Sequence, residues 1–509
     1  MVSNDHHHRG RLWSSALVKR VVCLVRLAVS ASVTYIVITS SNPNDIAGFK
    51  AKFGMSTIAM LLPHFRRLGS EFIWIAIGQS IAVLGGIVGI RILTSMLSPE
   101  RYGELALGMT LATLQQQLIM GPICGACGRY FAPARENGQL VAYLRAVKQL
   151  LMGATVLIIG VATLISLGLW AFNYEKWLRL VLLACLLGLL SGYGLSLDNI
   201  QNAARQRVVV AWHQSLMQWL RFLCALATVT WLGSSGRAAL QGYILASVVV
   251  LASQLVFFKR TILAGKALWT ERRPDNSPDL VRNALSYAWP FATWGVFTWM
   301  QLSSDRWALQ AFDNTRSVGL YAVLYQLGYY PMALFSDMLI QLSAPILFGI
   351  AGYGDNHGRL QRAHRLIWAL FLGLIVMTLI AVLISSLFHR QIFRLLVDQT
   401  YHNVSSLLAI MVLSGGLLAS GQVIALIFMM SYRTKHLLVP KVGTALLGVI
   451  LNVSGAYWFS LRGVIVANVI FSFIYVVWML YLANILKKIQ YLYKMWRPAS
   501  HCLSVGKRA

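Results

Sequence analysis

The chain contains few charged residues and very few acidic ones. Charged residues make up 12% of its 509 positions, with 16 Asp+Glu against 44 Lys+Arg, and this charged share is about half of what is usual in soluble proteins. Hydrophobic residues make up 57%, and long apolar runs recur along the whole length. This composition excludes a soluble domain with a single core and predicts a polytopic membrane protein.

Cysteines and catalytic motifs are also scarce. The six cysteines are scattered. Only Cys124 and Cys127 have redox-motif spacing, but they lie at the end of a predicted helix without a thioredoxin-like context, so we interpret them as small buried residues. The sequence contains no Walker A loop, no HExxH motif and no GxSxG motif. We therefore expect that the protein is not an enzyme and that it needs no cofactor or metal.

Twelve apolar windows along the chain predict twelve membrane-spanning helices, since about 20 residues are needed to cross the hydrocarbon. The windows are 72–92, 104–124, 147–170, 178–197, 208–232, 238–258, 284–304, 318–343, 366–388, 404–428, 435–458 and 463–486. An open strand cannot satisfy its backbone groups in lipid, so the predicted class is all-α. Six spans in each half give both halves the same orientation, which is a parallel repeat.

These windows divide the chain into five predicted parts. They are a basic leader at 1–67, a six-helix bundle at 68–258, a linker at 259–283, a second six-helix bundle at 284–486 and a basic tail at 487–509. The leader differs from the rest and includes an apolar run interrupted by Arg26. It is a signal peptide, an extra span or translated upstream sequence, and we favour an over-extended start, with Met55 or Met60 as the natural one.

The net charge of +28 is distributed unevenly between the predicted loops. Alternate loops on one side carry about 24 basic residues and those on the other side about ten, which by the positive-inside rule places both termini in the cytoplasm. The charge is therefore mainly a topology signal, with attraction to anionic membrane lipids as a second consequence. We expect no nucleic-acid partner.

A short motif occurs twice, about 216 residues apart. Arg91 precedes Gly103 by 12 residues, and Arg306 precedes Gly319 by 13 residues. Each arginine closes an apolar stretch and each glycine opens the next one, at equivalent places in the order of spans. The repeat predicts a transporter built from two related halves. A GxxxG pair in the first span, Gly85 and Gly89, predicts close helix packing.

Polar side chains inside the predicted spans are candidates for the binding site, because each is costly in lipid unless it faces a cavity or a partner. In the fifth span Gln214, Gln218 and Arg221 share one helical face. Arg221 is the best candidate for a cation that lines a cavity. Gln117 belongs to a run of three glutamines in the second span. The alternative for such glutamines is hydrogen bonding between helices.

The eighth span and the repeat motif supply the remaining candidates. Tyr330 and Asp337 lie on one polar stripe of the eighth span. Asp337 is a candidate partner for an arginine such as Arg221, or a site for a coupling ion. Arg91 and Arg306 are interfacial anchors or substrate ligands, and Asp305 is a candidate local partner for Arg306.

The motifs around the repeated arginines resemble those of a known family. The first half has GQS at 78–80, GGIVGIR at 85–91 and LSPERYG at 97–103, and the second half has SDRWAL at 304–309 and VGLYA at 318–322. They are similar to the Wzx-type oligosaccharide flippases of the multidrug/oligosaccharidyl-lipid/polysaccharide exporter superfamily. The resemblance covers roughly residues 68–490, and the first sixty residues depart from it.

The resemblance implies two six-helix bundles around a central cavity that opens alternately to each side, as in the MATE-like fold. It implies an oligosaccharide on undecaprenyl diphosphate as substrate, carried across the bacterial cytoplasmic membrane for exopolysaccharide or O-antigen synthesis. A polysaccharide polymerase and a chain-length regulator would then be partners. The diphosphate requires cations, which membrane-embedded arginines supply.

Two alternatives remain open at this stage. A cation-coupled multidrug antiporter of the same superfamily would need a carboxylate inside the first bundle, but the acidic residues there, Asp198 among them, fall at span ends or in loops. A polytopic polysaccharide polymerase or ligase would need a large external loop, which the predicted topology lacks.

Overall fold

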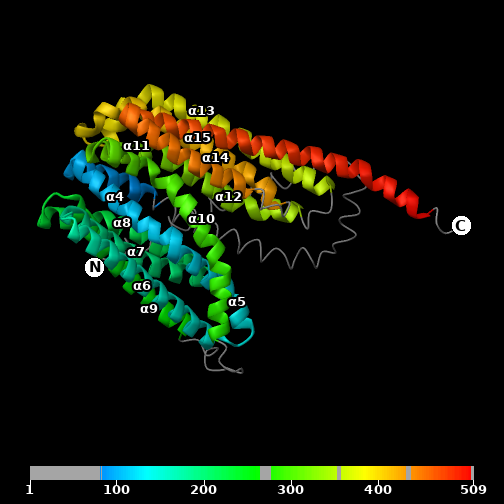
Figure 1. Cartoon of the computed structure of the whole chain (residues 1–509), viewed down its shortest axis with the longest axis horizontal. Coiled ribbons are helices and arrows are strands. Elements are labelled where there is room, and N and C mark those ends of the chain that lie inside the picture. The colour runs from blue at the N-terminus through cyan, green and yellow to red at the C-terminus, as the bar shows by residue number, and fades with distance from the viewer. Residues whose placement is uncertain (1–80, 82, 264–276, 352–356, 431–436, 506–509) are drawn as a thin grey trace, which may run out of the picture. The chain divides into compact units, whose positions relative to one another are not determined.

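The computed structural model describes residue 81 and residues 83–263, 277–351, 357–430 and 437–505. All regular secondary structure in these residues is helical (Figure 1), so the all-α prediction is confirmed. The leader at 1–67 and the middle of the linker lie outside the described residues. Seven of the described helices are long and apolar enough to cross a membrane, which identifies a multi-pass membrane protein.

In the first half, described helical elements overlap each of the six predicted windows. These elements are Val83–Met96, α4 (Pro99–Gln115), η1 (Gln116–Met120), α5 (Gly121–Glu136), α6 (Leu140–Ala171), α7 (Glu175–Ala203), α8 (Arg207–Leu232), α9 (Gly236–Phe258) and η2 (Lys259–Leu263). The segments α4, η1 and α5 follow one another without a break and cover the window 104–124. The GxxxG prediction is confirmed: a Cβ at Gly89 would overlap the Phe222 ring on α8, and one at Gly85 would lie 3.1 Å from Nε1 of Trp219.

The second half repeats this order. Its elements are α10 (Ser277–Phe312), α11 (Thr315–Leu324), η4 (Tyr325–Tyr329), α12 (Tyr330–Ala351), α13 (His357–Leu396), η5 (Gln399–Leu407), α14 (Leu408–Met430) and α15 (Leu438–Val505). A kink at Ser460, which has a left-handed φ of 52°, separates the two last predicted windows within α15. Both described ends of the predicted linker are helical, and the tail continues α15 as far as Val505.

Each half has a wide helical turn in its second spanning segment. The π-helical turn η1 joins α4 to α5, and η4 joins α11 to α12. At the end of η1, a Cβ on Gly121 would lie only 2.6 Å from the Gln116 carbonyl oxygen, so glycine makes room for the displaced carbonyl. Such turns are frequent at functional sites.

The apolar residues divide between a packed interior and an exposed surface. In the second half α14 packs against α12, α13 and α15, and the buried aromatic residues include Tyr401, Phe428 and Tyr475. On α6, Val156 and Leu164 are each 71% exposed. Because the helix is apolar all round, we assign this exposed face to lipid contact. The helix α10 contacts α15 in its own half and α5 and α6 in the first half, and Figure 1 shows it between the two groups of helices.

Candidate functional site

The two repeat glycines meet each other where α4 crosses α11. A Cβ on Gly103 would overlap the backbone oxygen of Thr315, and a Cβ on Gly319 would overlap the backbone oxygen of Pro99. Both helices begin at this crossing, with Pro99 at the start of α4 and Asn314 capping α11 by accepting a hydrogen bond from the Ser317 N–H at 2.9 Å. We call this contact the seam. Only glycine allows two backbones to approach this closely.

A second set of contacts continues the seam along the first described helix. Nη1 of Arg91 donates to the carbonyl oxygen of Val397, and the N–H of Asp398 donates to Oγ1 of Thr94 at 3.3 Å. One turn further, the Tyr401 hydroxyl donates to the carbonyl oxygen of Leu97 at 2.8 Å. The spacing of three residues places Arg91, Thr94 and Leu97 on one face of the helix. Arg91 therefore binds the end of α13, where free carbonyl groups favour a cation.

Acidic residues at the seam are held in the charged form. The backbone N–H of Thr400 donates to the Asp398 carboxylate at 3.2 Å, and this bond lowers the pKa of Asp398. A backbone hydrogen bond also lowers the pKa of Glu100, despite some burial, and a hydrogen bond from Ser98 and the charge of Arg316 add to this. The Arg316 guanidinium lies 3.4 Å from the Glu100 carboxylate. Both partners are exposed, so this pair contributes little to stability.

Three aromatic side chains connect the halves beside the seam. The Tyr102 hydroxyl donates to Oε1 of Gln326 at 2.7 Å. From α10, Nε1 of Trp299 donates to the Thr110 carbonyl oxygen at 2.7 Å, and Nε1 of Trp307 donates to Oγ1 of Thr110 at 3.0 Å. Residues 91–110 thus carry most of the described hydrogen bonds between the halves, with Tyr130 of α5, bonded to α10, as a further one.

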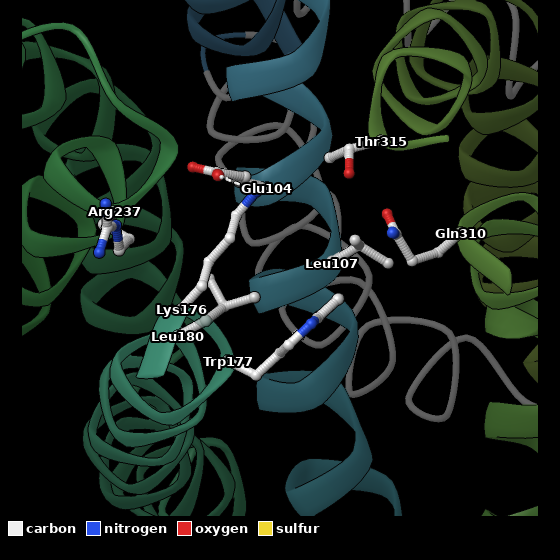
Figure 2. Close-up of a pocket in the computed structure, with 8 residues that line it drawn as sticks. All are labelled: Glu104, Leu107, Lys176, Trp177, Leu180, Arg237, Gln310 and Thr315. Atoms are coloured by element: carbon white, nitrogen blue, oxygen red, sulfur yellow. Dashed lines mark ion pairs between the residues drawn. The ribbon is translucent and has the colours of Figure 1, made fainter. Parts of the chain in front are cut away.

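A small pocket lies beside the seam, between α4, α7 and α9 of the first half and α10 and α11 of the second (Figure 2). Its volume is about 90 Å³. Figure 2 shows an ion pair among its lining residues, in which Nζ of Lys176 lies 3.0 Å from Oε1 of Glu104. Oε1 of Gln310 is buried without a hydrogen-bond partner. The pocket has room for a few water molecules, at about 30 Å³ each in the liquid, and is too small for a sugar chain.

Arg306 is enclosed within the second half. Its guanidinium lies 3.4 Å from the carboxylate of Asp305 and 4.3 Å from the ring centre of Tyr325. Asp305 is 2% exposed and accepts from the backbone N–H of Arg306 at 2.7 Å and from the Tyr321 hydroxyl. Asn468 on α15 donates to the Tyr321 oxygen at 2.8 Å. The positive charge is therefore already neutralised, and Asp305 and Arg306 form a buried pair that connects α10, α11 and α15.

Arg221 has a different environment. It is half-buried on α8, its guanidinium lies 5.1 Å from the ring centre of Tyr243, and its Nε has no hydrogen-bond partner in the part of the chain that the structure describes. Across the halves it is close enough to Tyr330, the first residue of α12, to interact with it electrostatically. Among the described residues no carboxylate lies within ion-pair distance of Arg221, and Asp337 is no exception. Within the described residues Arg221 is thus a cation without a counter-charge, with Tyr243 of the first half and Tyr330 of the second half near it.

The other predicted site residues take up separate positions. Tyr330 is 46% exposed, and Asp337 is exposed two turns further along α12. Gln218 is half-buried one turn before Arg221. Gln117 lies in η1, where its carbonyl oxygen would be overlapped by a Cβ at Gly295 of α10. The structure therefore brings Arg221 and Tyr330 together and places Arg91, Arg306 and Gln117 in contacts between or within the helical bundles.

Two groups of polar residues were not predicted from the sequence. The rings of Tyr321 and Tyr325 lie beside the Arg306 guanidinium, and Tyr329 stacks on Tyr325. The three tyrosines recur every four residues, a signal that the sequence contained. Asp198 was set aside because the predicted window ended at 197, but α7 continues to Ala203 and Asp198 lies inside it. Gln214 donates to its carboxylate at 3.1 Å, so Gln214 is bound within the first half.

Comparison with protein families gives one match. Residues 68–350 match the family described as "Polysaccharide biosynthesis protein". Among curated protein sequences none matches the chain.

Several solved membrane transporters have a similar fold. An inward-facing multidrug resistance MATE family transporter of the MOP superfamily has a TM-score of 0.60 at 13% identity, covering 81% of this chain and 99% of that one. The lipid II flippase MurJ in an inward closed conformation has a TM-score of 0.60 at 16% identity, covering 81% and 87%. An outward-facing MATE transporter has a TM-score of 0.55 at 15% identity, covering 82% and 95%. At these identities the likeness establishes the fold, and the predicted MATE-like class is confirmed.

Proposed function

The chain belongs to the polysaccharide biosynthesis protein family, and on this premise we propose that it is a flippase for oligosaccharide units linked to undecaprenyl diphosphate. It would turn these units across the bacterial cytoplasmic membrane for exopolysaccharide or O-antigen synthesis. Both termini would lie in the cytoplasm, and a polysaccharide polymerase and a chain-length regulator would use the product. The structurally similar MurJ is a lipid II flippase, which is compatible with a lipid-linked substrate.

The observation that carries the proposal is the free charge of Arg221. A diphosphate needs cations, and the planar guanidinium binds phosphate oxygens through two parallel hydrogen bonds. Arg306 is neutralised by Asp305, whereas the guanidinium of Arg221 lies over the ring of Tyr243 and its Nε has no hydrogen-bond partner among the described residues. Tyr330, which is 46% exposed, offers an apolar face and a hydroxyl group beside it, which suit sugars and isoprenoid chains. We therefore assign the diphosphate to Arg221.

Transport in this proposal requires the seam to open. Residues 91–110 meet the second half near the repeat glycines. In the topology predicted from the distribution of basic residues, this contact lies at the external end of the helices. With this end closed, Arg221 receives the lipid-linked unit from the cytoplasmic leaflet. Separation of α4 from α11 then releases the unit to the external leaflet. The pocket beside the seam is too small to hold the cargo, so the exit path forms only when the halves move apart.

The test is export by Arg221 variants in cells that depend on this chain. Arg221→Ala removes a charge-assisted contact that is worth about 1.5–3 kcal/mol, so we expect export to fall by roughly 10- to 100-fold at unchanged membrane abundance. Arg221→Lys should restore part of it, because a point charge replaces a bidentate group. Arg179→Ala is the matched control, since Arg179 is 66% exposed on α7 and should export normally. Surface polymer and protein level are measured together.

Full export by Arg221→Ala at normal abundance would remove this residue from the binding site. The same cells separate the flippase from a multidrug antiporter. A flippase leaves the accumulation of cationic drugs unchanged when the chain is deleted and causes lipid-linked units to build up in the inner leaflet. Increased drug accumulation without loss of polymer would favour the antiporter instead.

A further inference from the structure

The pocket beside the seam carries an excess of positive charge. Lys176 on α7 and Arg237 on α9 line it, together with the carboxylate of Glu104 on α4. Glu104 is paired with Lys176 at 3.0 Å. Arg237 is half-buried, and among the described residues no carboxylate lies within ion-pair distance of it. The pocket therefore contains one positive charge that the chain itself does not neutralise.

Two neighbouring arginines at the same end of the helices have polar partners. Nη1 of Arg101 donates to Oγ of Ser234 at 2.6 Å, and Arg316 lies 3.4 Å from the carboxylate of Glu100. Arg237 has no such partner in the part of the chain that the structure describes. A half-buried guanidinium that is not hydrogen-bonded is costly, and an anionic ligand would remove this cost.

Three helices of the two halves begin at this pocket. Lys176 lies in the first turn of α7, Arg237 in the first turn of α9, and Thr315 is the first residue of α11. The start of α9 lies directly against α4, because a Cβ on Gly236 would overlap the backbone oxygen of Arg101. The N-terminal end of a helix has a partial positive charge, so the backbone adds to the charge of the two side chains.

The second half contributes an acceptor that lacks a donor. Gln310 on α10 lines the pocket, and its Oε1 is buried without a hydrogen-bond partner among the described residues. Figure 2 shows Gln310 and Arg237 on opposite sides of α4. An unsatisfied buried carbonyl oxygen indicates a place for a ligand that donates a hydrogen bond. The pocket thus offers a cation from the first half and an acceptor from the second.

Exposed aromatic side chains indicate the depth of the pocket in the membrane. Tyr174, which is 57% exposed, directly precedes α7, and Trp231, which is 86% exposed, lies at the end of α8 shortly before α9 begins. Tyrosine and tryptophan collect at the level of the lipid headgroups. The first turns of α7 and α9, which carry Lys176 and Arg237, therefore lie at the depth where phospholipid phosphate groups are found.

We propose that this pocket binds a phosphate group, carried by a membrane phospholipid or present as free phosphate. The planar guanidinium of Arg237 binds two phosphate oxygens at once, and Lys176 adds a second positive charge. A hydroxyl group of the bound molecule donates to Oε1 of Gln310. The pocket volume of about 90 Å³ holds the phosphate and its nearest atoms, while the acyl chains of a lipid stay in the membrane.

A phosphate group bound here contacts both halves of the chain. The pocket is complete only while α4 lies against α11, so the ligand binds the closed seam better than the open one. It therefore stabilises the closed seam by mass action. The effect on release of the cargo rests on the proposed function, whereas binding of the phosphate group does not.

The test is thermal unfolding of the purified full chain in detergent, with phosphatidylglycerol, phosphatidylcholine or inorganic phosphate added at constant ionic strength. Phosphatidylglycerol, whose headgroup has hydroxyl donors, should raise the unfolding temperature in a saturable manner and at lower concentration than phosphatidylcholine. Arg237→Ala should raise the half-saturating concentration roughly 10- to 100-fold, and Arg237→Lys should recover part of the loss. Gln310→Leu should raise it roughly 2- to 10-fold.

Arg179→Ala is the matched control, since Arg179 lies at the same end of α7, is 66% exposed and does not line the pocket. It should respond to phosphatidylglycerol like the wild type. If Arg237→Ala does not fold, Arg237→Gln gives the same comparison with a polar side chain.

An excess of inorganic phosphate distinguishes the two sources of the phosphate group. If it abolishes the shift caused by phosphatidylglycerol and itself gives a shift that depends on Arg237, free phosphate occupies the site. If the phosphatidylglycerol shift persists, the lipid headgroup occupies it. Equal half-saturating concentrations in Arg237→Ala and Arg179→Ala would overturn the proposal. None of these measurements uses the lipid-linked cargo, so failure here leaves the Arg221 export test unaffected.

Discussion

Replacement of Gly319 by alanine tests whether the seam holds the two halves together. In an open helical position this change gains about 1 kcal/mol. At the seam the new Cβ overlaps the Pro99 carbonyl oxygen, which is backbone and cannot rotate away, and overpacking of this kind costs about 1–3 kcal/mol. We take the upper part of that range, so that a net loss of about 1–2 kcal/mol remains. The ratio of the closed to the open seam should then fall about 5- to 30-fold.

The assay is crosslinking of a cysteine pair, Glu100→Cys with Arg316→Cys, by a short bifunctional thiol reagent. Gly319→Ala should slow crosslinking by up to the factor given above, and Gly103→Ala should act in the same direction because its Cβ would overlap the Thr315 oxygen. Gly160→Ala on α6 is the control, since a Cβ there meets nothing within 4 Å. Equal crosslinking rates in Gly319→Ala and Gly160→Ala would refute the close backbone contact.

Two further predictions concern the buried ion pair and the topology. Arg306→Ala leaves the buried carboxylate of Asp305 without its positively charged partner, which costs about 3–5 kcal/mol; folded protein, measured by size-exclusion chromatography, should decrease, and adding Asp305→Asn should recover part of it. No recovery in the double variant would contradict the pairing. Reporter fusions after Lys266 and Lys435 should be cytoplasmic and one after Asn173 external, because basic residues concentrate in the corresponding loops. An external reporter after Lys266 would exclude the twelve-span arrangement.

The order of the helices could be predicted from the sequence, because the length of an apolar stretch is set by the thickness of the hydrocarbon. Helix ends could not be predicted in the same way. The helix α7 extends past the apolar window to Ala203, since its backbone hydrogen bonds continue after the apolar residues stop. For this reason Asp198 was misjudged as a residue at a span end, although it is bound by Gln254 from α9.

The hydrogen-bond and ion-pair partners of the polar residues could not be predicted from the sequence either. Arg91 and Arg306 occupy similar places in the repeat, yet Arg91 binds the Val397 carbonyl oxygen of the other half and Arg306 binds its neighbour Asp305. The difference depends on the segment after α13, which lies some 300 positions from Arg91. Helical periodicity places a side chain on a face but does not identify the residue that it meets.

Glu100 and Arg316 occupy equivalent positions, because each lies three residues before its repeat glycine, and they face each other at 3.4 Å. If two identical half-length subunits met at such an axis, each position would meet its own copy. Glutamate would then oppose glutamate, or arginine would oppose arginine, and like charges would repel. A single covalent chain escapes this constraint, because its two copies can diverge to opposite charge. The pair therefore places opposite charges at equivalent positions of the two halves, which a symmetric homodimer could not do.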